Sequence, residues 1–325
     1  MRKWLGLWIL SSLVATGCAS TATGPLRPAA PADAAARPVL WRDPGPIGSR
    51  DLFWGSGHES RAPQGPFSFV EEDTSTGTNP KITVKDARGE TWDVKFDEEV
   101  HAEVAANRLV WALGFIVEDH YFVRQGIVTG ARGLGRAAQH LGADGTFKDA
   151  RFRWRNPATP RTEEEWTLQR NPFVGSRELS GLAILMTMIN NWDIEGPRNN
   201  KVLRARRPDG TVERWFLVSD LGATFGRMGG GGITNHSKWT LTHFQQERFI
   251  DKVGGGMLHL AYDGYDPDVD RVPLDHARWF AALASQLTEA QLRRAFEAAG
   301  ATPEEVNGYA AKLAEKIAAL SKAVG

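Results

Sequence analysis

A group of strand-like runs precedes the first helical pattern of this chain. The runs are short and rich in β-branched and aromatic residues, and polar turns separate them. A helical pattern over residues 98–113 follows, because Val100, Val104 and Leu109 fall near one face. The predicted strands before the helix are residues 67–70, 81–85 and 91–96, and those after it are residues 115–117 and 121–123. We therefore expect the folded part to open in the order β, loop, β, β, α, β, which excludes a simple helical bundle.

Later segments add further strands but end in helices. Residues 147–155 alternate and predict a strand, and an apolar stripe predicts a helix over 176–191. Runs at 201–204 and 215–218 flank an Asp209-Gly210 turn and predict a hairpin. Apolar spacing over 275–324 predicts a helical end. The fold class expected from this order is α+β, with a β-rich first part and a mostly helical second part.

Composition excludes several classes of protein. The chain carries 39 basic and 39 acidic side chains, so we expect no nucleic-acid partner. Its 42% hydrophobic content is that of a globular protein. A single cysteine allows neither an internal disulfide nor a cysteine-based zinc cluster. The histidines show no paired metal spacing, and we expect no haem, flavin or zinc.

The first 18 residues have the pattern of an export signal. Arg2 and Lys3 precede an apolar run over residues 4–15, which is too short to span a membrane. The run ends in LVATGC, which resembles the lipobox of bacterial lipoproteins. This resemblance implies that residues 1–17 are a cleaved signal peptide and that Cys18 is acylated, for example with palmitate. The alternatives are an uncleaved anchor and a chance cysteine after an ordinary signal.

An Ala/Pro-rich stretch follows Cys18, and we expect residues 18–50 to form an extended tether. The implied location is the bacterial cell envelope, with the lipid in the membrane. In bacterial lipoproteins an Asp after the cysteine favours retention in the inner membrane, so the resemblance, with Ala19 at this position, implies the outer membrane, facing the periplasm.

Two segments resemble the protein kinase superfamily. GTNPKITVKDARGETWDVKF (77–96), followed by EVHAEVAANRLVWALG (99–114), resembles the amino-terminal lobe of HipA-like serine/threonine kinases. NNWDIEGPRNN (190–200) resembles their catalytic loop and that of the CotH kinases, and SDLG (219–222) occupies the place of the metal-binding motif. The resemblance implies a two-lobed kinase-like fold, with residues 51–125 as the β-rich lobe and 126–325 as the helical lobe.

The resemblance also implies roles for individual residues. Lys95 would hold nucleotide phosphates and pair with a glutamate of the next helix. Glu103 fits the family pattern better than Glu99, which lies one turn earlier. Asp193 would orient the acceptor hydroxyl and take its proton.

Magnesium ligands are implied at Asp220 and at an asparagine after Asp193, since carboxylate and amide oxygens suit this cation. Asn199 is the preferred asparagine. Its interval from Asp193 is six residues where the family has five, so Asn200 stays an alternative.

Polar residues between the first two predicted strands form a candidate phosphate loop. Ser75, Thr76, Gly77 and Thr78 offer hydroxyls and backbone amides, although the loop has a single glycine. Lys81 is a second candidate phosphate ligand.

Two functions remain open at this stage. The first is an envelope-anchored phosphotransferase that uses Mg²⁺ and ATP, or another nucleotide, to modify a hydroxyl acceptor. The second is a non-catalytic kinase-like lipoprotein that binds a ligand or an envelope protein. The residues Lys95, Glu103, Asp193 and Asp220 favour the enzyme, whereas the irregular interval and the single-glycine loop favour the binder.

Overall fold

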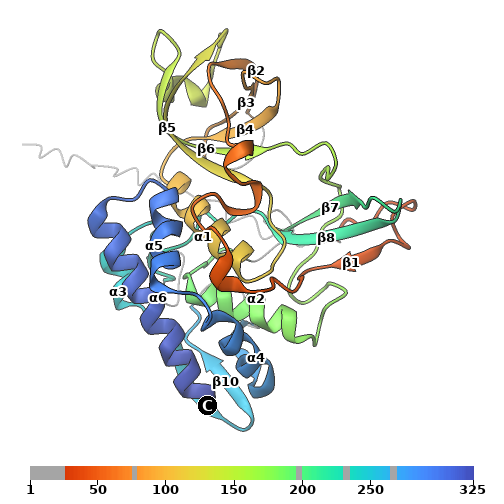
Figure 1. Ribbon diagram of the computed structural model, residues 1–325, viewed down its shortest axis with the longest axis vertical. Coiled ribbons are helices and arrows are strands. Elements are labelled where there is room, and N and C mark those ends of the chain that lie inside the picture. The colour runs from red at the N-terminus through yellow and green to blue at the C-terminus, as the bar shows by residue number, and fades with distance from the viewer. Residues whose placement is uncertain (1–25, 75–78, 195–199, 230–234, 264–268) are drawn as a thin grey trace, which may run out of the picture.

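The computed structural model describes residues 26–74, 79–194, 200–229, 235–263 and 269–325. Within these ranges the chain is α+β, as the sequence predicts (Figure 1). The strands are β1 Arg37–Val39, β2 Phe67–Asp73, β3 Lys81–Lys85, β4 Thr91–Lys95, β5 His120–Thr129, β6 Thr146–Trp154, β7 Asn200–Arg206, β8 Val212–Val218, β9 Ile250–Gly254, β10 Met257–Leu260 and β11 Arg271–Pro273. The helices are α1 Glu99–Ala112, α2 Arg177–Met188, α3 Leu241–Gln246, α4 Leu274–Ala284, α5 Glu289–Ala298 and α6 Pro303–Val324.

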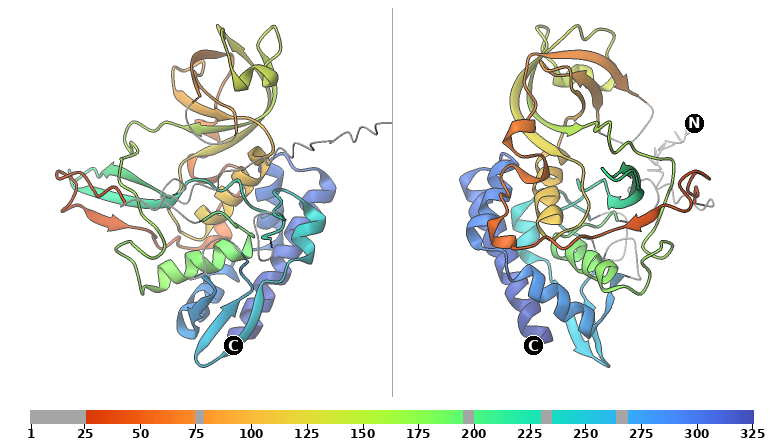
Figure 2. Two further views of the ribbon diagram at one scale, coloured as in Figure 1. Left: turned by 180° about the vertical axis from the view of Figure 1, so that it is seen from behind. Right: turned by 45° about the vertical axis from the view of Figure 1, so that its right-hand side comes forward.

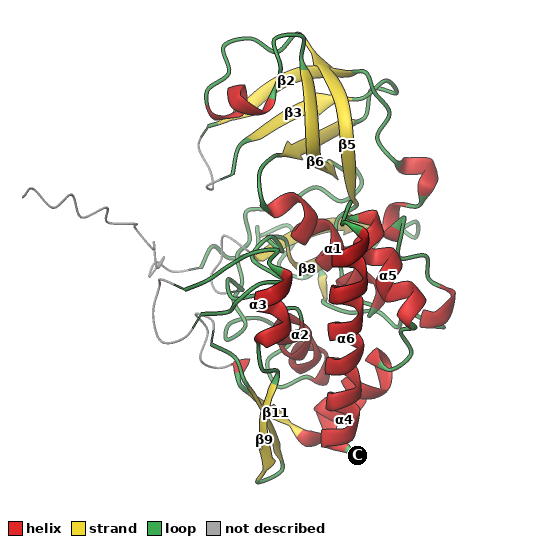
Figure 3. Cartoon of the chain, turned by 90° about the vertical axis from the view of Figure 1, so that its left-hand side faces the viewer, coloured by secondary structure: helices red, strands yellow, loops and turns green. Residues whose placement is uncertain are grey.

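The first part of the chain forms a closed barrel in the order β2-β3-β4-β6-β5. Alternate residues of these strands point inward, as period-two patterning requires. The barrel interior is apolar and aromatic; it includes Trp92, Val94, Phe147 and Phe152, each at most 2% exposed. Figures 1 and 3 show the barrel at one end of the molecule, above α1.

The barrel corrects the predicted division of the chain. A boundary at residue 125 falls inside β5, and β6 pairs with both β4 and β5 to complete the barrel. The β-rich part therefore extends to Trp154. Residues 115–117 are also not a strand, although Phe115 makes an isolated bridge to Trp41. These segments were predicted from local sequence pattern, which carries no information about which strands pair with one another.

The expected tether does not extend to residue 50, because the chain joins the fold from residue 37 onward. Residues 37–39 instead form β1, which pairs in parallel with β8. Leu40 and Ile47 are at most 2% exposed and belong to the main core. Figure 2 shows this part of the chain running beside the β7–β8 hairpin and back to the helices rather than forming a free tether.

Helices pack around α1 and α2 to form the body below the barrel (Figure 3). Nearly every side chain of α1 is buried, because barrel strands and α5 surround it. Small alanines along α1 allow this close packing. Helices α5 and α6 each begin with a capping box, at Thr288 and Thr302, which fixes their first turns. In the part of the chain that is described, no helix combines the length and apolar character needed to cross a bilayer.

Candidate functional site

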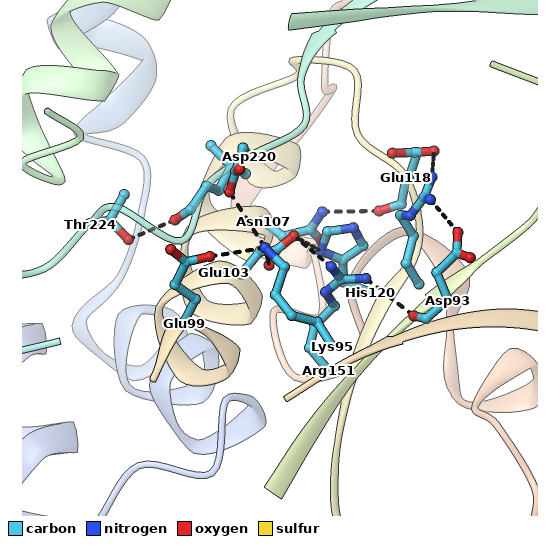
Figure 4. A network of polar contacts seen from close by, with 12 residues as sticks. Asp93, Lys95, Glu99, Glu103, Asn107, Glu118, His120, Arg151, Asp220 and Thr224 are labelled. Carbon is cyan, nitrogen blue, oxygen red and sulfur yellow. Dashed lines mark hydrogen bonds and ion pairs between the residues drawn. The ribbon is translucent and has the colours of Figure 1, made fainter. Parts of the chain in front are cut away.

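Lys95, the last residue of β4, lies at the centre of a buried charge cluster (Figure 4). Its side chain is 4% exposed, and its Nζ lies 2.8 Å from Glu103 Oε2 and 3.0 Å from Glu99 Oε2. Asp220 Oδ1 is 3.5 Å from the same nitrogen. The four residues come from a barrel strand, helix α1 and the segment after β8, and we call them the Lys95 cluster.

Helix α1 supplies both glutamates of the cluster. Residues four apart share one helix face, so Glu99 and Glu103 project toward the same point. The chain turns from β4 into α1 within four residues, which places Lys95 beside the first turns of the helix. The sequence offered Glu103 and Glu99 as alternative partners of Lys95, and the fold brings both into contact with it.

Asp220 reaches the cluster from the β7–β8 hairpin, two residues beyond the end of β8. Its side chain is 40% exposed, whereas those of Glu99 and Glu103 are at most 8% exposed. Close approach depends on Gly222, because a Cβ there would lie 2.6 Å from Glu99 Oε2. The Asp-Leu-Gly order therefore has a steric reason, and Asp220 is the cluster's most accessible carboxylate.

The carboxylates keep Lys95 charged. Burial alone would lower the pKa of Lys95, but Asp220, Glu103 and Glu99 raise it above its ordinary value. Burial would likewise raise the pKa of Glu103, and Arg151 and Lys95 lower it below its usual range. The ammonium groups of Lys95 and Lys238 lower the pKa of Glu99 to about 2, against the effect of burial. Lys95, Glu99 and Glu103 are therefore ionised at neutral pH.

Two cations extend this network beyond the predicted residues. Arg151 of β6 binds Glu103 at 3.2 Å, and Lys238 binds Glu99 at 2.6 Å. Arg151 lies in the alternating run that predicts a strand over residues 147–155, and this alternation is the signal that could have placed its side chain on the face toward Glu103. No local signal marks Lys238, which lies over 130 residues from Glu99 in sequence.

Lys81 lies directly opposite Lys95 in the β3–β4 register. Like charges facing one another across strands are unfavourable. Burial and the neighbouring Lys95 both lower the pKa of Lys81, while Asp220 opposes them. Within the described residues the Lys81 ammonium has no ion pair or hydrogen bond. A half-buried lysine in this position is suited to an anionic ligand.

Asp193 lies in the loop after α2, and this loop runs beside the segment that follows Asp220. Phe225 N donates to Ile189 O at 2.9 Å, and Trp192 N donates to Ala223 O at 3.3 Å. Asn191 Oδ1 accepts from Asp193 N at 3.0 Å, which orients the backbone at Asp193. The fold thus brings the two motif segments together, although Asp193 and Asp220 lie 27 positions apart in the sequence with the β7–β8 hairpin between them.

Of the two candidate magnesium-binding asparagines, Asn199 and Asn200, the structure describes Asn200. It begins β7, opposite Val218, and is fully buried. Its Nδ2 donates to Trp166 O at 3.2 Å and to Ile194 O at 3.4 Å, whereas its Oδ1 has no hydrogen-bond partner among the described residues. Val218, opposite Asn200 in the strand pair, lies two positions before Asp220, so Asn200 and Asp220 both lie near the same end of the β7–β8 hairpin.

Several predicted site residues lie outside the described residues: Cys18, Ser75, Thr76, Gly77, Thr78 and Asn199.

Three carboxylates of the Lys95 cluster offer the oxygen donors of a metal site. Oxygens of Glu99, Glu103 and Asp220 lie within 4.8 Å of one another. Oxygen donors of this kind fit a hard divalent cation such as Mg²⁺. Since Lys95 engages both glutamates, Asp220 is the carboxylate best placed to bind one.

Comparisons with known proteins add no relative. No family model, no curated protein and no solved structure matches this chain.

Proposed function

We propose that this protein is a kinase-like phosphotransferase that uses a magnesium nucleotide to modify a hydroxyl acceptor. The observation that carries the proposal is the meeting of Lys95, Glu103 and Asp220, with distances of 2.8 and 3.5 Å from the Lys95 ammonium. The sequence resemblance assigns these residues to phosphate binding, lysine positioning and metal binding, respectively. The order of barrel, α1, α2 loop, β7–β8 hairpin and Asp220 supports a two-lobed kinase-like fold.

Phosphoryl transfer needs positioning and charge neutralisation more than covalent chemistry. Lys95 and Lys81, whose ammonium has no ion pair with a described residue, would bind the nucleotide phosphates from the barrel side. Asp220, with Asn200 or Asn199, would hold a magnesium ion, which when bound neutralises phosphate charge. Asp193 would orient the acceptor hydroxyl and take its proton as the oxygen attacks the terminal phosphorus and the nucleoside diphosphate leaves.

The test is nucleotide binding by the chain from residue 18 with Cys18→Ser. We expect Mg-ATP or another Mg-nucleotide to raise the melting temperature, since saturation at 100 times Kd stabilises a protein by about 2.7 kcal/mol. Asp220→Ala should abolish the shift. Asp209→Ala, at the exposed turn of the same hairpin, should retain it. If no common nucleotide stabilises the parent chain, the phosphotransferase proposal is wrong.

A non-catalytic ligand-binding protein is the second candidate. The six-residue interval between Asp193 and Asn199 favours it, because it alters the register of the metal ligands. A thermal shift without transfer of labelled phosphate to any protein or to water would select this candidate.

We also propose, from the signal pattern alone, that acylated Cys18 anchors the protein in the cell envelope. Acyl labelling in cells should disappear in Cys18→Ser, and persistence of the label would contradict the anchor.

A further inference from the structure

Residues 37–50, which we call the N-terminal strap, contact two elements that carry the Lys95 cluster. The first is β8, which leads to Asp220. Strand β1 extends along it in parallel, with Arg37 opposite Glu213 and Val39 opposite Trp215 (Figure 1). Arg42 adds an ion pair to the buried Glu213. The strap therefore covers the edge of the strand that positions Asp220.

The second element is the carboxyl end of α1. Arg42 N donates to Gly114 O at 2.9 Å, and Ile116 N donates to Leu40 O at 3.3 Å. The Trp41 indole donates to Leu113 O at 2.8 Å. Gly114 has φ 88°, and a Cβ there would lie 2.3 Å from Arg42 O, so this contact requires glycine.

Arg50 completes the contact with α1. Its guanidinium donates to Trp111 O at 2.6 Å and lies 4.5 Å from the centre of the Trp111 ring. Trp111 O also accepts from Gly114 N at 2.9 Å, so Arg50 adds a second donor to this carbonyl. A cation at the end of a helix also interacts favourably with the helix dipole. Gln291 of α5 holds this end of the strap, because its Nε2 donates to Ile47 O at 2.7 Å and to Arg50 O at 3.0 Å.

We propose that the N-terminal strap is a positioning element for the Lys95 cluster, with Arg50 as its principal positioning residue. Helix α1 is fixed at its start by the ion pairs of Glu99 and at its end by the strap. The same strap lies on β8, so it ties the helix that carries Glu103 to the strand that leads to Asp220. A shift of α1 along its axis would pull Glu103 away from Lys95.

The proposal rests on the proposed function only for its effect on catalysis, so its test is made without nucleotide. In Arg50→Met we expect amide hydrogen exchange to rise at least tenfold along α1, including the turn at Glu103. Modification of Lys95 by an amine reagent, followed by mass spectrometry, should become at least threefold faster, because Lys95 is 3% exposed when α1 is in place.

Arg88→Met is the matched control. Arg88 also donates to backbone carbonyls, those of Ser60 and Ala62 at 2.7 and 2.8 Å, but away from α1. It should leave α1 exchange and Lys95 modification unchanged. Trp41→Phe, which removes only the indole bond to Leu113 O, should change both in the same direction as Arg50→Met and serves if that variant does not fold.

Faster exchange confined to residues 109–114, with Lys95 modification unchanged, would overturn the proposal, because the strap would then only seal the helix end. Equal effects of Arg50→Met and Arg88→Met would overturn it as well. If Mg-ATP is turned over, kcat should fall about tenfold in Arg50→Met, with KM for nucleotide changed less than twofold. Absence of turnover in the parent chain would contradict the proposed function and leave the exchange result to decide on the strap.

Discussion

Two buried lysines of this protein have opposite surroundings. Lys95 and Lys316 are 3% and 2% exposed, respectively. Lys95 lies among the carboxylates of Glu103, Glu99 and Asp220. Lys316, on α6, donates instead to Met188 O at 2.9 Å and to Asn190 Oδ1 at 2.6 Å. No carboxylate of the described residues lies within ion-pair distance of Lys316.

Their pKa values shift in opposite directions for this reason. Burial lowers the pKa of Lys316 well below its ordinary value, and Lys312 lowers it further. Burial acts on Lys95 too, but its carboxylates outweigh it and raise the pKa. The partners of a buried lysine, rather than its burial, therefore decide whether it carries charge. Lys316 holds the loop before Asp193, whereas Lys95 keeps a charge that can act on a ligand.

Replacement of Lys95 by methionine should have the largest effect on stability. It leaves Glu99 and Glu103 buried, and loss of one partner of a buried pair costs about 3–5 kcal/mol. We expect the lower end, about 3 kcal/mol, because Lys238 and Arg151 stay beside the two glutamates. Urea unfolding of Lys95→Met measures this loss.

Lys316→Met is the matched control for that experiment. Methionine restores no hydrogen bond to Met188 O or Asn190 Oδ1, but it removes a buried amine, so we expect a loss under about 2 kcal/mol. A larger loss for Lys316→Met than for Lys95→Met would contradict the comparison.

Gly222→Ala tests the close packing of the Lys95 cluster. The new Cβ would lie 2.6–2.7 Å from atoms of Glu99, so either Glu99 or the segment after Asp220 must move. Overpacking of this kind costs about 1–3 kcal/mol. We expect this loss in urea unfolding together with a weaker nucleotide-dependent thermal shift. Gly210→Ala is a useful reference because it has open space but φ 85°, so its cost is backbone strain alone and the nucleotide shift should be retained.

The smallest expected effect is the contribution of Lys316 to the pH dependence of the free energy of unfolding. The folded protein keeps Lys316 neutral at pH values where the unfolded chain is protonated, so the unfolded state binds more protons. Stability from this group therefore rises with pH, by about 1.4 kcal/mol per unit, from the lowered folded pKa up to 10.5.

Lys95 behaves oppositely, since its contribution is complete below 10.5 and is lost as pH rises through its raised folded pKa. As pH rises toward 10.5, the unfolding free energy of the parent chain should therefore rise relative to that of Lys316→Met. Equal slopes of the two proteins up to this pH would contradict a lowered pKa of Lys316.

Local pattern predicted most elements of the fold. The apolar stripe of residues 176–191 became α2, and the runs around Asp209-Gly210 became β7 and β8. The pattern failed where partners are distant in sequence. Residues 37–39 look like part of a Pro-rich tether, and they become a strand only because β8 offers an open edge.

The candidate site shows the same limit. The resemblance to HipA-like kinases pointed to Lys95 and Asp220, and helix geometry indicated that Glu99 and Glu103 share a face. Neither indicated that Lys95 contacts both glutamates, or that Lys238 binds Glu99. Those contacts depend on how close α1, β4 and the segment after Asp220 approach, which Gly222 permits.

Local sequence pattern was enough to predict the α+β class and the positions of most helices and strands, because periodicity and turn chemistry act over a few residues. The candidate residues of the Lys95 cluster came from the resemblance to kinase motifs. Packing was needed to show that β6 closes the barrel, that the N-terminal strap joins α1 to β8, and which charges meet at Lys95. Burial and ion pairing are set by distances between segments far apart in the chain, and those distances exist only after packing.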